Sequence, residues 1–510
     1  MTRGNPEVTG VFGGHGGTGA GAPSRPVVAA GGPAPTAGVP TTATAHFGQG
    51  GKAVRVLPHG KSRSVAVIGV GYVGLPTAAT LAHLGHQVTC GDADPRKVGM
   101  LQEGRVPIVE EHLEEVVREG QAAGRLRFVL GASEAVVGAE FVFLCVPTPQ
   151  ADDGSADLSY VEAVAAEIGP LLAPGTIIVN KWTVPVGSTL VVERVIERGD
   201  ITVVSNPEFL REGTAVGDSL HPERIVVGAA DQAAAARVGE LFAGTHAPLL
   251  ITDAATAETI KYASNAFLAT KLSFINAVAG LCEAVGADVR DVILGLGYDK
   301  RIGFEYLRPG PGWGGSCLPK DTRALVHIAE EAGYDFSFLK GAISTNDEQF
   351  VRVVDKIVTA LRRSPDGTGP TGSLDGRTVA VWGLAFKAGT DDLRNSPAVE
   401  VVRRLADGGA TVRAFDPTVT VPEGEASVRV DAPELTGLAD GVVSAFPDPY
   451  TACHGAAAVV VLTEWDEFRW LDFERVAGEL SEPVVVDIRN LLDPAQLRRL
   501  GFDYTGLGRR

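Results

Sequence analysis

Short apolar runs alternate with longer helical stretches along much of the chain, a pattern typical of a parallel sheet covered by helices. The runs are rich in Val, Ile and Phe, and we expect buried strands at residues 64–68, 141–146, 177–179 and 203–205. Each run ends in a polar or proline-rich turn. Ligands bind beyond the carboxyl ends of parallel strands, so these turns are candidate site loops, although each alone is more typical of an ordinary connection.

Residues 257–285 depart from this alternation and predict one long helix of about 40 Å. Apolar residues occur on more than one of its faces, which is typical of a helix that joins domains or lies at a subunit interface. Lys261 and Asn265 share a face near its start. A solvated surface explains a single lysine well, but it explains a Lys–Asn pair flanked by Tyr262 and Phe267 poorly. The pair is therefore a candidate for chemistry.

A Gly-, Pro- and Ser-rich connector at residues 364–376 precedes a second strand–helix–strand pattern. Its first strand, residues 379–383, resembles residues 65–69. Later positions match at one constant offset, Leu405, Gly409, Val412 and Asp416 corresponding to Leu81, Gly85, Val88 and Asp92. The first turn of this second unit has gained Lys387 and Arg394 and lost the glycines, so we expect it to bind something other than a dinucleotide. The predicted fold is α/β, with two doubly wound Rossmann-like domains joined by a long central helix.

The glycines Gly69, Gly71 and Gly74 form a G-x-G-x-x-G motif between the first strand and a helix. Alone this motif is a weak signal, but Asp92 follows about twenty positions on, at the end of the next strand. In that arrangement the amides at the helix start bind a pyrophosphate and the carboxylate binds ribose hydroxyls. A tight turn without a ligand is the alternative. We expect NAD rather than NADP, because Asp92 would repel a 2′-phosphate.

Residues 312–321, GWGGSCLPKD, combine three glycines with a helix start at Pro319. Cys317 therefore lies at or just before a helix N-terminus, where the partial positive charge and Lys320 favour the nucleophilic thiolate. Asp321 lies within side-chain reach of the sulfur. A buried structural cysteine beside a glycine turn is the alternative, but the helix start and the Lys–Asp pair favour a nucleophile.

Composition narrows the function further. The chain has 510 residues, of which 45% are hydrophobic, and its net charge of −17 argues against a nucleic-acid or membrane-surface partner. The five cysteines are widely spaced without a CxxC pair, so we expect neither disulfides nor a metal site, and a reducing cytoplasm fits best. No apolar run approaches the roughly 20 residues that span a bilayer.

Together these patterns divide the chain into four parts. We expect a disordered Gly-, Pro- and Ala-rich extension at residues 1–61 and an NAD-binding domain at residues 62–253. A central helical domain with the cysteine follows at residues 254–363. The second nucleotide-binding domain occupies residues 376–510.

Seven motifs, all in family order, resemble those of the UDP-glucose/GDP-mannose dehydrogenase family over about residues 62–505. They are GVGYVG, VPTP, TVPVGS, NPEFLREG, KYASNAFLATK, RPGPGWGGSCLPKD and GLAFKAGTDDLRNSP. This family oxidises the C6 alcohol of a nucleotide sugar to a carboxylate with two NAD and one water. The resemblance favours UDP-glucose, oxidised to UDP-glucuronate, over GDP-mannose or another nucleotide sugar.

The resemblance implies a role for each candidate residue. Cys317 would form a thiohemiacetal and then a thioester, and Lys261 and Asn265 would hold the developing oxyanion. Asp321 would assist water and proton transfer, with Thr148 and Glu208 acting through ordered water. The implied cofactor contacts are Gly69, Gly71, Tyr72, Val73, Gly74, Asp92, Lys97, Thr148, Thr183, Glu212 and Arg394. The implied substrate contacts are Glu208, Phe209, Leu210, Lys261, Asn265, Arg301, Tyr306, Gly314, Phe386, Lys387 and Arg489.

In the family the arginine matching Arg301 can come from a neighbouring subunit, which implies a homodimer or a larger homo-oligomer. Two departures are Trp182, where a small Ser is usual, and Gln150, where Thr or an apolar residue is common. Two other classes remain as alternatives. A two-electron hydroxyacid dehydrogenase needs neither the cysteine nor the second domain, and a non-catalytic dinucleotide-binding scaffold would have lost a catalytic group.

Overall fold

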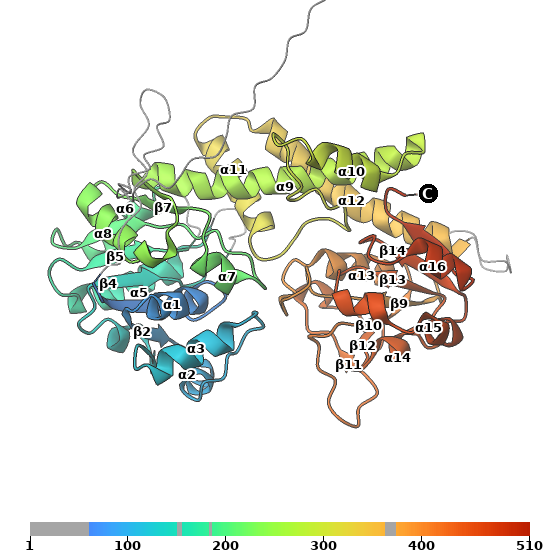
Figure 1. Cartoon of the computed structure of the whole chain (residues 1–510), viewed down its shortest axis with the longest axis horizontal. Coiled ribbons are helices and arrows are strands. Elements are labelled where there is room, and N and C mark those ends of the chain that lie inside the picture. The colour runs from blue at the N-terminus through green and yellow to red at the C-terminus, as the bar shows by residue number, and fades with distance from the viewer. Residues whose placement is uncertain (1–60, 150–155, 183–185, 363–373, 510) are drawn as a thin grey trace, which may run out of the picture. The chain divides into compact units, whose positions relative to one another are not determined.

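Two sheets organise the computed structural model, which describes residues 61–149, 156–182, 186–362 and 374–509 (Figure 1). These residues belong to one compact unit. The predicted extension lies outside the described residues except for Lys61, and Gln150 and Thr183 lie outside them too. The predicted fold class, two doubly wound α/β domains joined by a long helix, is confirmed.

The first sheet has eight strands in the order β3-β2-β1-β4-β5-β6-β7-β8. Its strands are β1 (Ser64–Ile68), β2 (Gln87–Asp92), β3 (Leu126–Leu130), β4 (Phe141–Leu144), β5 (Ile177–Asn180), β6 (Thr202–Ser205), β7 (Ile225–Gly228) and β8 (Leu249–Thr252). All neighbours pair in parallel except β6 and β7, which are antiparallel. The sequence did not predict this reversal of strand direction. The segment that connects β6 to β7 carries Glu208 and Glu212.

Helices cover both faces of the first sheet (Figure 1). They are α1 (Gly74–His83), α2 (Pro95–Gln102), α3 (Leu113–Ala122), α4 (Ala132–Ala135), α5 (Ser159–Ile168), α6 (Ser188–Ile196), α7 (Ala215–Leu220) and α8 (Gln232–Glu240). Buried apolar clusters lie on each face, one containing Leu81 and Phe143 and the other Ile178 and Val192. Burial of both faces explains why the strands read as continuous apolar runs.

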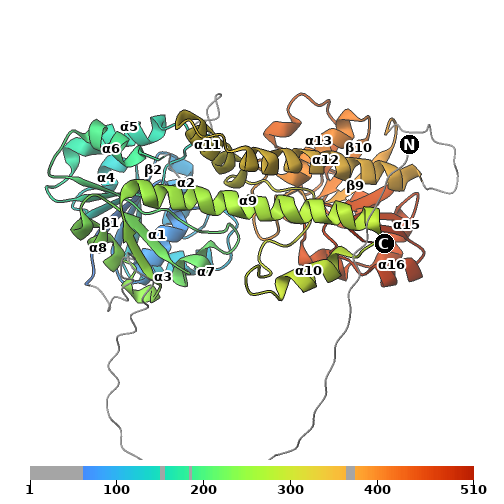
Figure 2. The same cartoon turned by 90° about the horizontal axis from the view of Figure 1, so that it is seen from above.

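The long helix α9 (Ala254–Val285) begins three positions before the predicted residue 257. Asp253 caps it by accepting a hydrogen bond from the Thr256 amide at 2.8 Å, and Gly286 ends it in the left-handed region. The helices α10 (Val289–Gly297), α11 (Leu318–Glu331) and α12 (Ser337–Arg362) follow. In both views α9 and α12 lie side by side (Figures 1 and 2).

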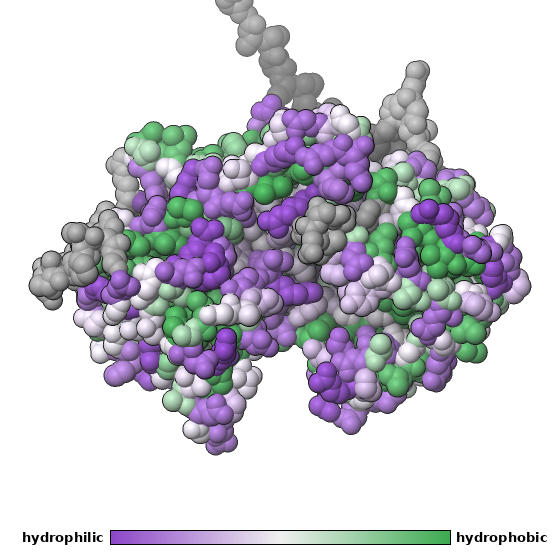
Figure 3. All heavy atoms as spheres, turned by 180° about the vertical axis from the view of Figure 1, so that it is seen from behind, coloured by the Kyte–Doolittle hydropathy of each residue, from purple (hydrophilic) through white to green (hydrophobic). Residues whose placement is uncertain are grey.

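The sequence predicted no apolar run long enough to span a bilayer, whereas α9 is apolar enough by length and composition, criteria that the core helix of a soluble protein also meets. It packs against α11 and α12, and its polar residues Lys261 and Asn265 are buried in the protein. Phe267, Phe274 and Leu281 are exposed at intervals of about two helical turns. On the face shown in Figure 3, hydrophilic side chains separate the apolar areas.

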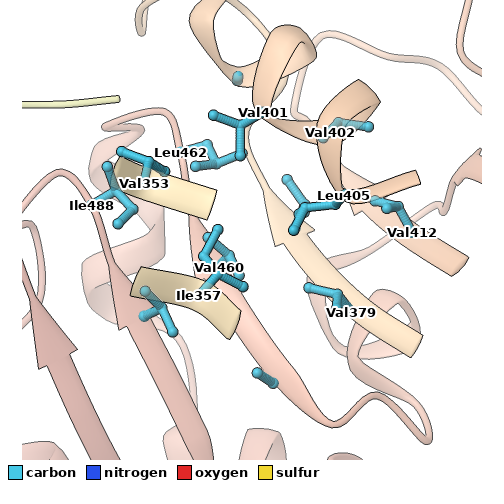
Figure 4. Close-up of a cluster of buried hydrophobic side chains, with 14 of the residues drawn as sticks. Val353, Ile357, Val379, Val401, Val402, Leu405, Val412, Val460, Leu462 and Ile488 are labelled. Carbon is cyan, nitrogen blue, oxygen red and sulfur yellow. The ribbon is translucent and has the colours of Figure 1, made fainter. Parts of the chain in front are cut away.

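The second sheet has seven strands in the order β11-β12-β10-β9-β13-β14-β15. They are β9 (Thr378–Trp382), β10 (Thr411–Phe415), β11 (Val428–Arg429), β12 (Val443–Ala445), β13 (Ala458–Val461), β14 (Val484–Asp487) and β15 (Asp503–Gly506). Its helices are α13 (Pro397–Asp407), α14 (Pro449–Cys453), α15 (Phe473–Glu479) and α16 (Pro494–Arg499). Val353 and Ile357 of α12 pack with Leu405 of α13 and Val460 of β13 (Figure 4), so α12 belongs to the core of this domain.

Candidate active site

The glycine loop between β1 and α1 has the shape of a ligand cradle. A Cβ atom on Gly69 would lie 2.7 Å from the Cys145 carbonyl oxygen, and one on Gly74 would lie 1.8 Å from that of Gly69. These two glycines therefore allow the backbone itself to pack closely. A Cβ on Gly71 would meet no atom within 4 Å, so this glycine faces open space. A pyrophosphate fits that position, with Tyr72 and Val73 leading into α1.

Asp92, at the end of β2, completes the cradle. Its Oδ2 accepts a hydrogen bond from the Val70 amide at 3.0 Å, and its Oδ1 accepts one from the Asp94 amide at 2.9 Å. Each oxygen keeps a further lone pair, so two ribose hydroxyls can still be bound. Lys97 lies nearby on the first turn of α2 and is partly exposed. The residues present thus fit a dinucleotide with a free 2′-hydroxyl.

The matching carboxylate of the second domain is used differently. Asp416 is buried, and its Oδ2 accepts hydrogen bonds from the amides of Leu384 and Ala385 at 2.7 and 2.9 Å. Thr418 binds Oδ1, and the Trp465 indole binds Oδ2. No lone pair remains for a ribose. The repeat predicted from the sequence is therefore a structural repeat, not a second dinucleotide site of the same kind.

The cysteine loop packs tightly against the second domain. A Cβ on Gly314 would lie 2.0 Å from the Asn395 carbonyl oxygen, and one on Gly315 would lie 2.9 Å from the Phe386 ring. The Gly315 amide also donates to the Asn395 carbonyl at 3.1 Å. Only glycines fit here. They bring Cys317, at the N-cap position of α11, beside the loop that follows β9.

Cys317 is partly exposed, and its Sγ lies 3.6 Å from Ser316 Oγ. Ser316 in turn donates to Glu212 Oε1 at 2.8 Å. Burial raises the pKa of Cys317 to about 12, Glu208 adds to the rise, and Lys261 opposes it. Burial and the neighbouring carboxylates therefore oppose the thiolate that the helix N-terminus favours.

Lys261 of α9 forms a buried ion pair with Glu208, with Nζ and Oε1 2.7 Å apart. Burial lowers the pKa of Lys261, but Glu208, Cys317 and Asp321 outweigh it, so the net pKa is raised and the side chain is an ammonium. Glu208 Oε2 accepts the Leu210 amide at 2.7 Å. Two cations lie near the Phe209 ring, with Arg224 3.8 Å and Lys261 Nζ 5.6 Å from its centroid.

Asn265, one turn further along α9, donates from Nδ2 to Asp321 Oδ2 at 2.6 Å. Lys320 Nζ lies 2.6 Å from Oδ1 of the same carboxylate. Lys320 therefore neutralises Asp321. The sequence suggested that Lys320 is the local charge that activates Cys317, but the structure pairs this charge with Asp321. The Lys261–Glu208 pair joins α9 to the segment after β6, and the Asn265–Asp321 pair joins α9 to the first turn of α11.

Glu212 meets residues from the second domain. Its carboxylate lies 3.8 Å from Arg394 Nη2, and Arg394 also binds Asp392. Burial and the neighbouring Asp392 raise the pKa of Glu212 to about 7. Tyr72 donates to Asp391 Oδ1 at 2.8 Å, and the Arg394 guanidinium lies 5.4 Å from the Tyr72 ring. The predicted cofactor residues Tyr72, Glu212 and Arg394 are thus brought together.

The predicted substrate residues of the second domain also cluster. Arg489 Nη2 donates to the Phe386 carbonyl at 3.2 Å, and Lys387 Nζ lies 5.5 Å from the Phe386 ring. Burial lowers the pKa of Lys387, with the acidic groups near it opposing the shift. Tyr306 has a left-handed backbone with φ of 61°. It lines a cavity of about 610 Å³ together with Phe209, Leu210, Lys261 and Asn265.

Three further predicted site residues complete the comparison. The Arg301 side chain is 89% exposed and, among the described residues, its ion-pair partner is Asp299 and not a group of this site. Thr148 is buried beyond the end of β4, and Thr183 lies outside the described residues. The departure Trp182 is partly buried, and its indole nitrogen has no partner among the described residues.

Sequence reasoning missed two residues of the site. Ser316 links the cysteine to Glu212, and its position next to Cys317 was the available signal. Lys181 follows a buried strand directly, donates to Asn206 Oδ1 at 3.1 Å and lines the same cavity as Lys261. Burial lowers the pKa of Lys181 to about 8.

Three family models match consecutive parts of the chain. They describe the NAD binding, central and UDP binding domains of the UDP-glucose/GDP-mannose dehydrogenase family, at residues 63–246, 255–348 and 380–494. The chain belongs to this family, and the cofactor of its first domain is NAD.

Individual relatives agree with this assignment. The chain is 43% identical to UDP-glucose 6-dehydrogenase of Pseudomonas aeruginosa, over 87% of this chain and 97% of the relative. It is 40% identical to UDP-glucose 6-dehydrogenase TuaD of Bacillus subtilis, over 88% and 93%. Among solved structures, a UDP-glucose dehydrogenase of Pyrobaculum islandicum matches with a TM-score of 0.76 and 36% identity, over 89% of this chain and 100% of that chain.

Proposed function

We propose that the protein oxidises the C6 alcohol of UDP-glucose to the carboxylate of UDP-glucuronate, with two NAD and one water. The observation that carries this proposal is Cys317 at the start of α11, beside the Lys261–Glu208 pair and between two nucleotide-binding domains. A two-electron dehydrogenase needs no nucleophile at this place. When bound, NAD accepts a hydride in each oxidation.

Lys261 and Asn265 act on the oxygen of the reacting carbon. A buried ammonium and an amide N–H stabilise the negative charge that develops there, first on the alkoxide and then on the tetrahedral adduct. Glu208 holds Lys261 in place through the 2.7 Å ion pair. Asp321 orients Asn265 and, as a buried carboxylate, takes part in proton transfer from the attacking water.

Cys317 captures the aldehyde formed by the first oxidation. Its sulfur forms a bond to the carbonyl carbon, the C=O π pair moves to the oxygen held by Lys261 and Asn265, and the thiol proton leaves through Ser316 toward Glu212. The second oxidation converts this thiohemiacetal to a thioester. Water then adds to the acyl carbon, the carbon–sulfur bond breaks, and the carboxylic acid and the thiol are released.

The loop after β9 binds the nucleotide in this proposal. Lys387 and Arg489 are the cations beside Phe386, and the saturated Asp416 leaves this domain free for a UDP group instead of a dinucleotide. We further propose a homodimer in the cytoplasm. The exposed Phe267, Phe274 and Leu281 of α9 support it, as does Arg301, which needs a neighbouring subunit to reach a site.

A stoichiometric assay tests the proposed function. With limiting UDP-glucose and excess NAD, the purified protein should form two NADH per sugar, measured by absorbance. One NADH per sugar would overturn the four-electron mechanism. A higher kcat/KM with GDP-mannose than with UDP-glucose would overturn the substrate and leave the mechanism intact.

A further inference from the structure

Glu110, in the loop between α2 and α3, holds a segment far away in the sequence. Its Oε2 accepts a hydrogen bond from the Gly213 amide and its Oε1 accepts one from the Ala215 amide, both at 2.7 Å. Ala215 is the first residue of α7, and the N-cap residue Thr214 makes no side-chain cap. Helix starts favour a carboxylate that accepts hydrogen bonds from their free amides, and Glu110 supplies this carboxylate to α7 from another part of the chain.

The segment held in this way carries two acidic residues of the candidate site. Glu208 lies near its beginning and Glu212 directly precedes Gly213. Gly213 has φ of 83°, and a Cβ there would lie 2.7 Å from the Gly389 carbonyl oxygen. Glu212 is therefore fixed between an amide bound to Glu110 and a hydrogen bond to Ser316.

We propose that Glu110 is a positioning residue that keeps the Glu212 carboxylate against Ser316 and so within proton-transfer reach of Cys317. This inference rests on the proposed function, because it gives Glu212 a proton to accept. Burial raises the pKa of Glu110, the two amides oppose the rise, and Lys387 and Asp218 are the charged side chains that face it. The two hydrogen bonds, not the charge alone, set the position of the loop.

The test compares Glu110→Gln with Glu111→Gln. In Glu110→Gln the side chain has one acceptor oxygen, and its NH₂ group faces an amide donor. One of the two hydrogen bonds from Gly213 and Ala215 is therefore lost. Glu111 is the matched control, because it lies on the same loop with a side chain 67% exposed. The two hydrogen bonds from the Gly213 and Ala215 amides to Glu110 form what we call the Glu110 clamp. Hydrogen exchange at these two amides measures the clamp directly and needs no substrate.

We expect faster exchange at these two amides in Glu110→Gln only. The kcat with UDP-glucose should fall about tenfold while the KM values for both substrates change less than about threefold. The decisive measurement is the double variant Glu110→Gln/Glu212→Gln. If Glu110 acts through Glu212, the double variant is no slower than Glu212→Gln alone.

Other outcomes overturn the proposal. Faster exchange with wild-type kcat would make Glu110 a helix cap without a catalytic consequence, and losses that multiply in the double variant would show that it acts independently of Glu212. If Glu110→Gln does not fold, Glu110→Asp replaces it, because the shorter carboxylate keeps the charge and cannot reach both amides. A wild-type protein inactive on UDP-glucose would refute the proposed function, whereas unchanged exchange in the variant would refute the clamp.

Discussion

Asn265 Nδ2 and Asp321 Oδ2 lie 2.6 Å apart, and Asp321 is completely buried. With Lys320 on its other oxygen, this carboxylate connects the long helix α9 to the helix that starts at Cys317. A change at Asp321 should therefore affect both the Asn265 amide and the cysteine loop.

Asp321→Asn should lower kcat by about 100-fold, because the amide cannot take part in proton transfer and leaves Lys320 without its counter-charge. Steady-state NADH formation measures this. Asp335→Asn is the control, since Asp335 is exposed and pairs with Lys340 at the surface. A near-normal kcat for Asp321→Asn would remove Asp321 from the chemistry.

Cys317→Ser should bind UDP-glucose like the wild type and fall below about 1% of its turnover, because a hydroxyl at this site is a poor nucleophile and no thioester can form. Calorimetric titration measures binding and NADH formation measures turnover. Full turnover of this variant would mean that the cysteine is structural.

The NAD preference over NADP should be at least tenfold in kcat/KM, equivalent to about 1.4 kcal/mol. Asp92→Ala should narrow the ratio, because the repulsion of a 2′-phosphate is lost. Arg96, a cation that could soften the preference, is exposed and already pairs with Asp94, so Arg96→Ala should leave the ratio unchanged. Equal kcat/KM values for the two cofactors in the wild type would show that Asp92 does not face the ribose.

Activity should rise with pH through about 7, because Glu212 accepts a proton only when ionised and its pKa is raised to about 7 by burial and Asp392. A pH profile of kcat measures this, and Glu212→Gln should lack the acid limb. The raised pKa means that the folded state binds more protons than the unfolded state between about pH 4.5 and 7. This group's stabilisation is thus present at low pH and is lost as pH rises across that window. An unchanged acid limb in Glu212→Gln would assign it to another group.

The sequence predicted the parts of this site that depend on local pattern. Gly71 and Asp92, the helix start at Cys317 and the Lys261–Asn265 face all follow from spacing within one or two elements. The ionisation of Cys317 does not, because it depends on burial and on Glu208 and Glu212, which lie about a hundred residues away in the chain. The Glu110 clamp is equally non-local, and its glycine partner contributes only a backbone amide, which leaves no trace in side-chain composition. The antiparallel pairing of β7 with β6 could not be predicted either, because the apolar run that forms β7 reads like those of the parallel strands.

The saturated Asp416 has a consequence for the order of events. Two amides, Thr418 and Trp465 already bind this carboxylate, so in the proposed mechanism both oxidations use the cradle at Gly71 that the described residues form. Between them the half-oxidised sugar has to wait while that cradle is emptied and refilled, and an aldehyde held only by hydrogen bonds could escape during the wait. In the proposed mechanism, a carbon–sulfur bond to Cys317 prevents the escape. The interval then slows each cycle without releasing a reactive intermediate.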